Sequence, residues 1–359
     1  MGTVRQAKAT KRKKISQVSY QPRFKEAGKY AVYVSYQSLP KSVSDAKYIV
    51  YHKGEATEFS VNQRMGGGTW VYLGTFDFDK GCNEFNRVVC TNKASRRGVV
   101  TTDAVRFGGG MGNIERGDYT SGLPRCLEGA RYYAQWAGAP YKVYGGRKGE
   151  NDYADDINTR SLMTNWLGGG SVYMPAKNGK HVPIELSLAL HSDAGYNKDG
   201  KSTFGALAIC TTDYNDGILN SGISRFTSKD FARALRDNLV TDLTAQFGEF
   251  GKRYLWDRNY SETRLPEVPS AILEMLSHQN FPDMRIAQDP LGKFYIARSI
   301  YKTILRFVNS NHGTRYVVQP LAPQNFSVTQ NQGVALLSWT AQLDKTEPSA
   351  RPTSYIIYK

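Results

Sequence analysis

The sequence predicts a multidomain chain in which all-β segments flank one α/β domain. Short β-branched or aromatic runs separated by turn residues fill residues 18–110, which is typical of an all-β domain. Over residues 111–318, apolar runs with strand character alternate with patterns of amphipathic helices, which indicates an α/β domain. From residue 319 to residue 359 the pattern returns to β. A chain of 359 residues is long enough for two or three such domains.

Composition and net charge limit the classes of protein to which this sequence can belong. The chain carries a net charge of +15, and 40% of its residues are hydrophobic, enough for packed cores. No run of 18 apolar residues is present, which excludes a transmembrane helix, and no apolar segment follows the basic start, so no signal peptide is predicted. Residues 1–17 form a basic tail that we expect to be solvated and disordered. Because no nucleic-acid-binding module is found, the basic surface is expected to suit anionic polymers of another kind.

The first β region is predicted to fold as a β-sandwich, because several short strands follow one another with turn residues between them. Cys82 and Cys90 are close enough in sequence to bridge a hairpin, although spacing alone does not establish a disulfide. The expected strands are residues 30–36, 46–52, 69–76, 87–90 and 103–107.

Four segments of this region, in the same order, resemble the golvesin/xanthan-lyase carbohydrate-binding-like domain. The resemblance implies an accessory glycan-binding-like domain, in which Trp70, Tyr72 and Tyr33 are candidates for stacking on sugar rings. The alternative is that these aromatic side chains pack in the core. The matching segments are residues 28–36, 61–63, 67–76 and 103–107.

The α/β region begins at a glycine-rich stretch, residues 108–124, which we interpret as a junction between domains. Glu128 lies near the start of the first expected helix. Phe231 and the apolar residues that follow it every four positions predict a long amphipathic helix that ends at Gly248. The expected helices are residues 123–138, 155–165, 231–247 and 296–312, and the expected strands are 184–190, 204–210 and 269–277.

Two stretches of this region carry candidate chemistry. His191 follows a run with strand periodicity and precedes a loop-like Ser-Asp-Ala-Gly, so it is expected at the end of a strand, where a histidine can act as metal ligand or base. The alternative is a histidine that caps the loop. Glu274 is a single carboxylate inside an apolar run, and burying it is costly unless it is paired. We therefore expect Glu274 to face His191 from a neighbouring strand; the alternative is a structural glutamate bonded to backbone amides.

The stretches Ser-Leu-Ala-Leu-His-Ser-Asp-Ala and Pro-Ser-Ala-Ile-Leu-Glu resemble the zinc-dependent N-acetylmuramoyl-L-alanine amidase family. The resemblance implies a zinc cofactor held by His191, catalysis by Glu274, peptidoglycan or another cell-surface polysaccharide as partner, and a secreted or cell-envelope location. Glu128 is a candidate second zinc ligand. Arg264 is a candidate for orienting a substrate carboxylate or phosphate, with a surface ion pair as the alternative.

One part of the family pattern has no match. The family holds its zinc also with a histidine in a Gly-His-Gly-like loop, and the other histidines of this chain lie in no such loop. We expect the sandwich to be inserted in the amidase fold, with the first strand and the loop histidine upstream of this chain. As given, the chain is then expected to bind zinc weakly and to cleave poorly. The functional alternatives are a non-catalytic polysaccharide-binding protein and a xanthan-lyase-like polysaccharide-degrading enzyme.

The last segment resembles the first three strands of a fibronectin type III domain, with Trp339 as the core tryptophan. A complete domain of this kind needs about 100 residues, so this one is expected to be partial. Its expected strands are residues 326–328, 334–339 and 354–358.

Overall fold

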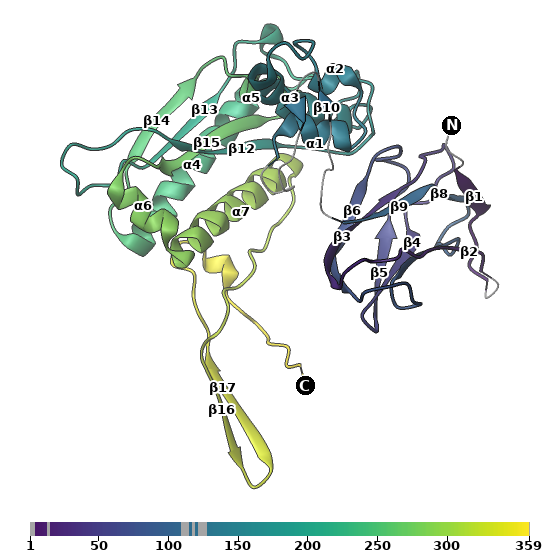
Figure 1. Ribbon diagram of the computed structural model, residues 1–359. Coiled ribbons are helices and arrows are strands. Elements are labelled where there is room, and N and C mark those ends of the chain that lie inside the picture. The colour runs from purple at the N-terminus through teal and green to yellow at the C-terminus, as the bar shows by residue number, and fades with distance from the viewer. Residues whose placement is uncertain (1–3, 13–14, 109–114, 117–118, 121–127, 359) are drawn as a thin grey trace. The chain divides into compact units, whose positions relative to one another are not determined.

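The computed structural model describes all residues except 1–3, 13–14, 109–114, 117–118, 121–127 and 359 (Figure 1). Most of the predicted glycine-rich junction and the start of the 123–138 helix lie outside the described residues. The chain divides into two compact units. The first comprises Met1–Leu186, Leu219–Ile223 and Leu265–Val268, and the second comprises Ser187–Ile218, Ser224–Arg264 and Pro269–Lys359.

The first unit contains the predicted sandwich, built from two antiparallel sheets. Apolar side chains that alternate along the strands, among them Val32, Tyr48 and Phe78, are fully buried and form its core. One sheet has the order β2 (Gln17–Tyr20), β7 (Arg87–Thr91), β4 (Ala46–His52) and β5 (Glu55–Val61). The other has the order β6 (Val71–Phe78), β3 (Gly28–Ser35) and β9 (Ala104–Phe107). All five strands expected from the sequence are present. Cys82 and Cys90 are free thiols.

The basic tail is partly ordered, contrary to the sequence prediction. β1 (Arg5–Lys8) pairs antiparallel with β8 (Val99–Thr102), from Arg5 opposite Thr102 to Lys8 opposite Val99. The charged side chains at both ends of β1 remain exposed, so the segment combines backbone pairing with solvated cations. Charge alone therefore did not exclude a strand, because backbone hydrogen bonds to β8 do not depend on the side chains.

The described part of the first unit also holds three helices and a short strand pair. α3 (Asp152–Gly168) contains the helix expected around residues 155–165, and its N-cap Asn151 accepts a hydrogen bond from the Ala154 N–H at 2.9 Å. Asn165, late in α3, donates to the Leu265 carbonyl and accepts from the Glu267 N–H, at 2.8 and 3.0 Å. The remaining elements are β10 (Glu115–Arg116), β11 (Tyr119–Thr120), α1 (Ala130–Trp136) and α2 (Tyr141–Tyr144).

The second unit is organised around a four-stranded mixed sheet of order β12-β15-β13-β14 (Figure 1). β12 and β15 are parallel, β13 is antiparallel to β15, and β14 is parallel to β13. The strands β12, β15 and β13 were predicted from the sequence, whereas β14 was not. The strands are β12 (Ser187–Asp193), β13 (Ala206–Cys210), β14 (Lys252–Asp257) and β15 (Ser270–Ser277).

Helices cover this sheet. α4 packs on β13 and β15 through buried side chains such as Phe231, Leu235 and Leu239, and α7 packs on α4. α7 ends as predicted at Gly313, which has φ of 62° and so adopts the left-handed conformation that glycine accepts without strain. The elements are η2 (Asn215–Gly217), α4 (Phe226–Phe247), α5 (Ser261–Arg264), α6 (Phe281–Gln288) and α7 (Pro290–His312). No helix of the described chain is long and apolar enough to cross a membrane.

The C-terminal part of the second unit is a hairpin rather than a three-stranded sheet. β16 (Gln324–Asn331) and β17 (Val334–Thr340) pair antiparallel and extend away from the four-stranded sheet (Figure 1). Residues 354–358 form no strand, although the Tyr355 ring lies against Trp339, at 5.1 Å between centroids. Pro352 ahead of them has no N–H to give to a ladder. The fibronectin type III prediction is therefore not confirmed.

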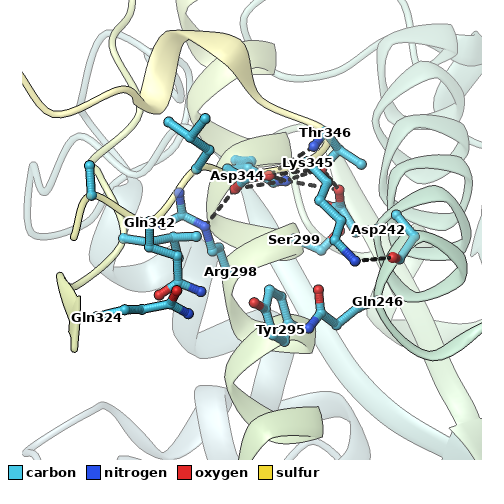
Figure 2. A pocket seen from close by; sticks show the side chains of 15 residues that line it. Asp242, Gln246, Tyr295, Arg298, Ser299, Gln324, Gln342, Asp344, Lys345 and Thr346 are labelled. Carbon is cyan, nitrogen blue, oxygen red and sulfur yellow. Dashed lines mark hydrogen bonds and ion pairs between the residues drawn. The ribbon is translucent and has the colours of Figure 1, made fainter.

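A polar pocket of about 280 Å³ lies beside α4, α7 and the segment after β17 (Figure 2). Lys302 reaches Asp242 at 2.8 Å and Asp344 at 3.4 Å, and Arg298 reaches Asp344 at 2.8 Å. Because these buried charges neutralise one another, we interpret the cluster as a clamp that fastens residues 341–347 to the helices. The short helix η3 (Pro348–Ala350) follows.

Candidate functional site

The pairing of β12 with β15 places His191 beside Glu274. The two residues are direct partners in the parallel register of these strands, so their side chains leave the sheet on the same face. β12 continues through Asp193, so His191 lies within the strand and not at its end as predicted. The ladder shifts register between His191 and Asp193, which marks the point where the regular strand gives way.

Both ring nitrogens of His191 meet carboxylates. Nε2 lies 3.1 Å from Glu262 Oε2, and Nδ1 lies 3.4 Å from Glu274 Oε1. The hydrogen bond with Glu262, followed by that with Glu274, raises the pKa of His191 to about 9, although burial opposes this. At neutral pH the ring is therefore an imidazolium that donates to a carboxylate on either side. The predicted proximity of His191 and Glu274 is confirmed; their roles stay predictions.

Glu262 is the functional candidate that the sequence analysis missed. It lies in the short helix α5, and its side chain is only 13% exposed. The position of Glu262 directly after Tyr-Ser gave only a weak signal of function, because nothing in the local sequence pattern predicts that α5 lies next to β12. Its position depends on how the chain turns after β14.

One carboxylate oxygen of Glu274 lacks a hydrogen-bond partner among the described residues. Oε1 faces His191, but Oε2 is buried and has no hydrogen-bond partner among the described residues. Buried polar atoms are nearly always paired, so an orphan oxygen of a carboxylate calls for an explanation such as a water or a ligand. His191 thus holds Glu274 through Oε1. Oε2 stays available to take up a proton or to accept a hydrogen bond.

A buried aspartate fixes the end of β15. Asp283 is fully buried and accepts hydrogen bonds from the backbone N–H groups of Ser277, Phe204 and Gly205, at 2.7, 2.8 and 3.1 Å. It thereby joins the last residue of β15 to the segment that enters β13. Because Glu274 lies three residues before Ser277, this carboxylate supports the strand that carries the site.

The described residues do not make a zinc site. A catalytic zinc usually has three protein ligands and one open position. No group of three or more His, Cys, Asp or Glu side chains in the described part of the chain could hold a metal ion. The two carboxylates near His191 lie against opposite ring nitrogens, so the three side chains do not converge on one point. The zinc implied by the sequence resemblance stays a prediction.

The other predicted site residues lie elsewhere. Arg264, in α5, donates to Asn259 at 2.5 Å, its guanidinium lies 5.8 Å from the Tyr214 ring, and it forms no ion pair with a described carboxylate. Glu128 belongs to the first unit, ahead of α1, and its Oε2 is buried without a hydrogen-bond partner in the described chain. In the described part of the chain, no hydrogen bond or ion pair joins Arg264 to His191 or Glu274.

The three aromatic candidates of the sandwich do not form one open platform. Tyr33 is only 3% exposed, because its ring packs against Tyr72 and against Trp136 of α1, at 5.2 and 4.8 Å between centroids. Trp70 is partly buried against the same cluster. Only Tyr72 is exposed, at 51%. For Tyr33 the core interpretation describes the structure better than a sugar platform does.

Comparison with known proteins identifies the sandwich. Residues 2–109 match the Golvesin C-terminal domain family. A xanthan lyase from Bacillus sp. (strain GL1) is 34% identical over 92 residues, which make up 25% of this chain and 10% of the lyase. The chain therefore spans about one tenth of the length of that relative. These findings confirm the golvesin/xanthan-lyase resemblance predicted from the sequence.

Solved structures of amidases are also similar to parts of the chain. The CwlD amidase from Clostridioides difficile, in complex with the GerS lipoprotein, is 14% identical with a TM-score of 0.32, over 46% of this chain and 66% of that chain. The N-acetylmuramyl-L-alanine amidase Ami1 from Mycobacterium smegmatis is 21% identical with a TM-score of 0.31, over 45% of this chain and 64% of that chain. Both similarities extend over less than half of this chain.

Proposed function

We propose that the second unit carries the proton-transfer groups of a cell-wall amide hydrolase of the N-acetylmuramoyl-L-alanine amidase type. The observation that carries the proposal is the in-register pair His191 and Glu274, which leaves the buried Oε2 of Glu274 without a partner among the described residues. The golvesin-like sandwich would be an accessory glycan-binding domain, and the protein would act at the cell envelope.

In this proposal Glu274 moves the protons. Its Oε2 takes a proton from the water that attacks the amide carbonyl carbon, and then gives it to the leaving nitrogen as the C–N bond breaks. The water oxygen stays on the acyl carbon as a carboxylic acid, which loses its remaining proton to solvent, so a carboxylate remains on the sugar side and a free amine on the peptide side. The imidazolium of His191, held by Glu262, keeps Glu274 oriented through Oε1. No step uses a metal ion, because the described donors do not form a metal site.

The test is hydrolysis of purified peptidoglycan by the 359-residue chain, read as newly released α-amine of L-alanine, with and without added zinc ions. Glu274→Gln should lower the rate by roughly 10²- to 10⁴-fold, the usual contribution of a positioned acid–base group. Glu249→Gln, at an exposed glutamate of the same unit, is the matched control and should not change it. Full activity in Glu274→Gln, or no amine release by the wild-type chain under either condition, would refute the proposal.

A further inference from the structure

β14 is an outer strand of the four-stranded sheet (Figure 1). A row of stacked side chains runs along it and onto the residue that follows it. Tyr254 and Trp256 are two residues apart and project from the same face of the strand. Their ring centroids are 6.2 Å apart and their planes differ by only 12°. The guanidinium of Arg258 lies 3.9 Å from the Trp256 ring centroid and continues the row. We call Tyr254, Trp256 and Arg258 the aromatic row.

Tyr254 and Arg258 of the aromatic row are open to solvent, Trp256 is half-buried, and the Arg258 cation has no counterion among the described residues. Tyr254 is 66% exposed and Arg258 is exposed as well. The charged neighbours on the strand are neutralised, since Lys252 pairs with Asp237 and Asp257 pairs with Lys229, at 3.1 and 3.3 Å. No described carboxylate forms an ion pair with Arg258. Its charge is therefore available to an anionic ligand that also offers a flat face to the rings.

The aromatic row lies on the same face of the sheet as the candidate site. Trp256 packs against the buried cluster of Leu207, Ile209 and Ile272, together with Ala189. Since Ala189 and Ile272 are two residues before His191 and Glu274, strand alternation puts all of them on one face. β13 alone separates β14 from β15, so at about 5 Å per strand the two strands are about 10 Å apart.

We propose that the aromatic row is a glycan-binding subsite for carboxylate-bearing sugar chains, an inference that rests on the proposed amide hydrolysis. The C–H face of a sugar ring would stack on Tyr254, and its carboxylate would pair with the Arg258 guanidinium, whose planar fork matches a carboxylate. Hydrolysis creates this carboxylate, because before the C–N bond breaks the same carbonyl belongs to a neutral amide. The subsite would therefore hold glycan whose peptide has already been removed.

A stacked aromatic pair beside a cation also fits single-stranded nucleic acid, whose bases stack and whose phosphates are anionic. The location favours the glycan, because the row shares its sheet face with the proton-transfer pair and lies about two strand spacings from it. Competition by an oligonucleotide is therefore one arm of the test.

The experiment measures binding of a peptide-free tetrasaccharide of alternating N-acetylglucosamine and N-acetylmuramic acid to the full chain by calorimetry. Tyr254→Ala and Arg258→Gln should each weaken binding roughly tenfold, in line with the loss of a charge-assisted hydrogen bond or a stacked ring. The methyl ester of the same sugar should bind the wild-type chain as weakly as the acid binds Arg258→Gln. In Arg258→Gln the ester and the acid should bind alike, because the partner of the carboxylate is already gone.

Tyr153→Ala, at an exposed tyrosine of α3 outside the sandwich, is the matched control and should bind like the wild type. Both altered residues of the row are exposed, so the variants should keep the wild-type melting temperature. The proposal is overturned if the wild-type chain does not bind the sugar, if only Tyr153→Ala loses binding, or if octathymidylate binds the row more tightly. Because binding does not require turnover, a chain that is active as an enzyme but does not bind this sugar would refute only the proposed subsite. An inactive chain whose binding depends on Arg258 refutes only the proposed function.

Discussion

Glu262 Oε2 lies 3.1 Å from His191 Nε2, on the side of the imidazole opposite Glu274. A neutral imidazole has one N–H and can satisfy only one of two carboxylates, whereas the imidazolium satisfies both. The two carboxylates thus determine the protonation state of the ring. They also leave it no free nitrogen in this arrangement.

Replacing Glu262 should lower the pKa of His191. In the wild-type chain that pKa is raised from 6.5 to about 9, first by the hydrogen bond with Glu262 and then by that with Glu274. We expect Glu262→Gln to move it back toward 6.5, as followed by NMR of the ring protons. Glu249→Gln should leave the titration where it was. An unchanged His191 titration in Glu262→Gln would show that Glu262 does not hold the ring.

The same pair predicts how stability depends on pH. A pKa that is raised on folding stabilises the protein below the unfolded value, and this contribution is lost as the pH rises through the folded value. The unfolding free energy of the wild type should therefore fall between about pH 6.5 and about pH 9. Denaturant unfolding at several pH values should show a flatter dependence in Glu262→Gln. Equal slopes for the two proteins would contradict this prediction.

Removing the Asp283 carboxylate should destabilise the sheet. Asp283→Ala would leave the backbone N–H groups of Phe204, Gly205 and Ser277 without their acceptor. Each unpaired buried donor costs about 1–3 kcal/mol, so we expect a loss of at least about 3 kcal/mol in denaturant unfolding. Asp213→Asn, at an exposed aspartate, should change stability by less than about 0.5 kcal/mol. A small effect of Asp283→Ala would mean that water replaces the carboxylate.

The sequence could predict that Glu274 pairs with His191, but it could not predict that Glu262 approaches His191. Glu274 stands out as a lone carboxylate in an apolar run, and the cost of burying it predicted a partner, which is His191. Glu262 carries no such signal, because its approach to His191 depends on a turn after β14 and not on its neighbours in sequence. β14 itself was missed because it is short and mixes charged with aromatic residues, so the aromatic row was missed with it. The strands β16 and β17 lie where the fibronectin type III resemblance had placed two strands, but residues 354–358 form no strand.

Breaking the clamp beside α7 should weaken the second unit. Lys302 is almost fully buried and forms ion pairs with both Asp242 and Asp344. Lys302→Met keeps the length of the side chain but leaves two buried carboxylates with less compensation, which typically costs about 3–5 kcal/mol. Lys345→Met, at an exposed neighbour, should cost less than about 1 kcal/mol. Equal unfolding free energies for the two variants would contradict the clamp.

Acid should open the same clamp. Burial alone would raise the pKa of Asp344, but hydrogen bonds from Arg298 and Thr346 and the charge of Lys302 outweigh it and hold the pKa below its ordinary value of 3.8. A pKa lowered on folding contributes stability above the unfolded value, and this stability is lost as the pH falls through the folded value. Stability should therefore drop below about pH 4, and Asp344→Asn, which cannot ionise, should show a shallower drop. Asp213→Asn should follow the wild type throughout. The unfolding free energy between pH 6 and pH 2 checks this, and parallel curves for wild type and Asp344→Asn would show that Asp344 does not contribute to the acid sensitivity.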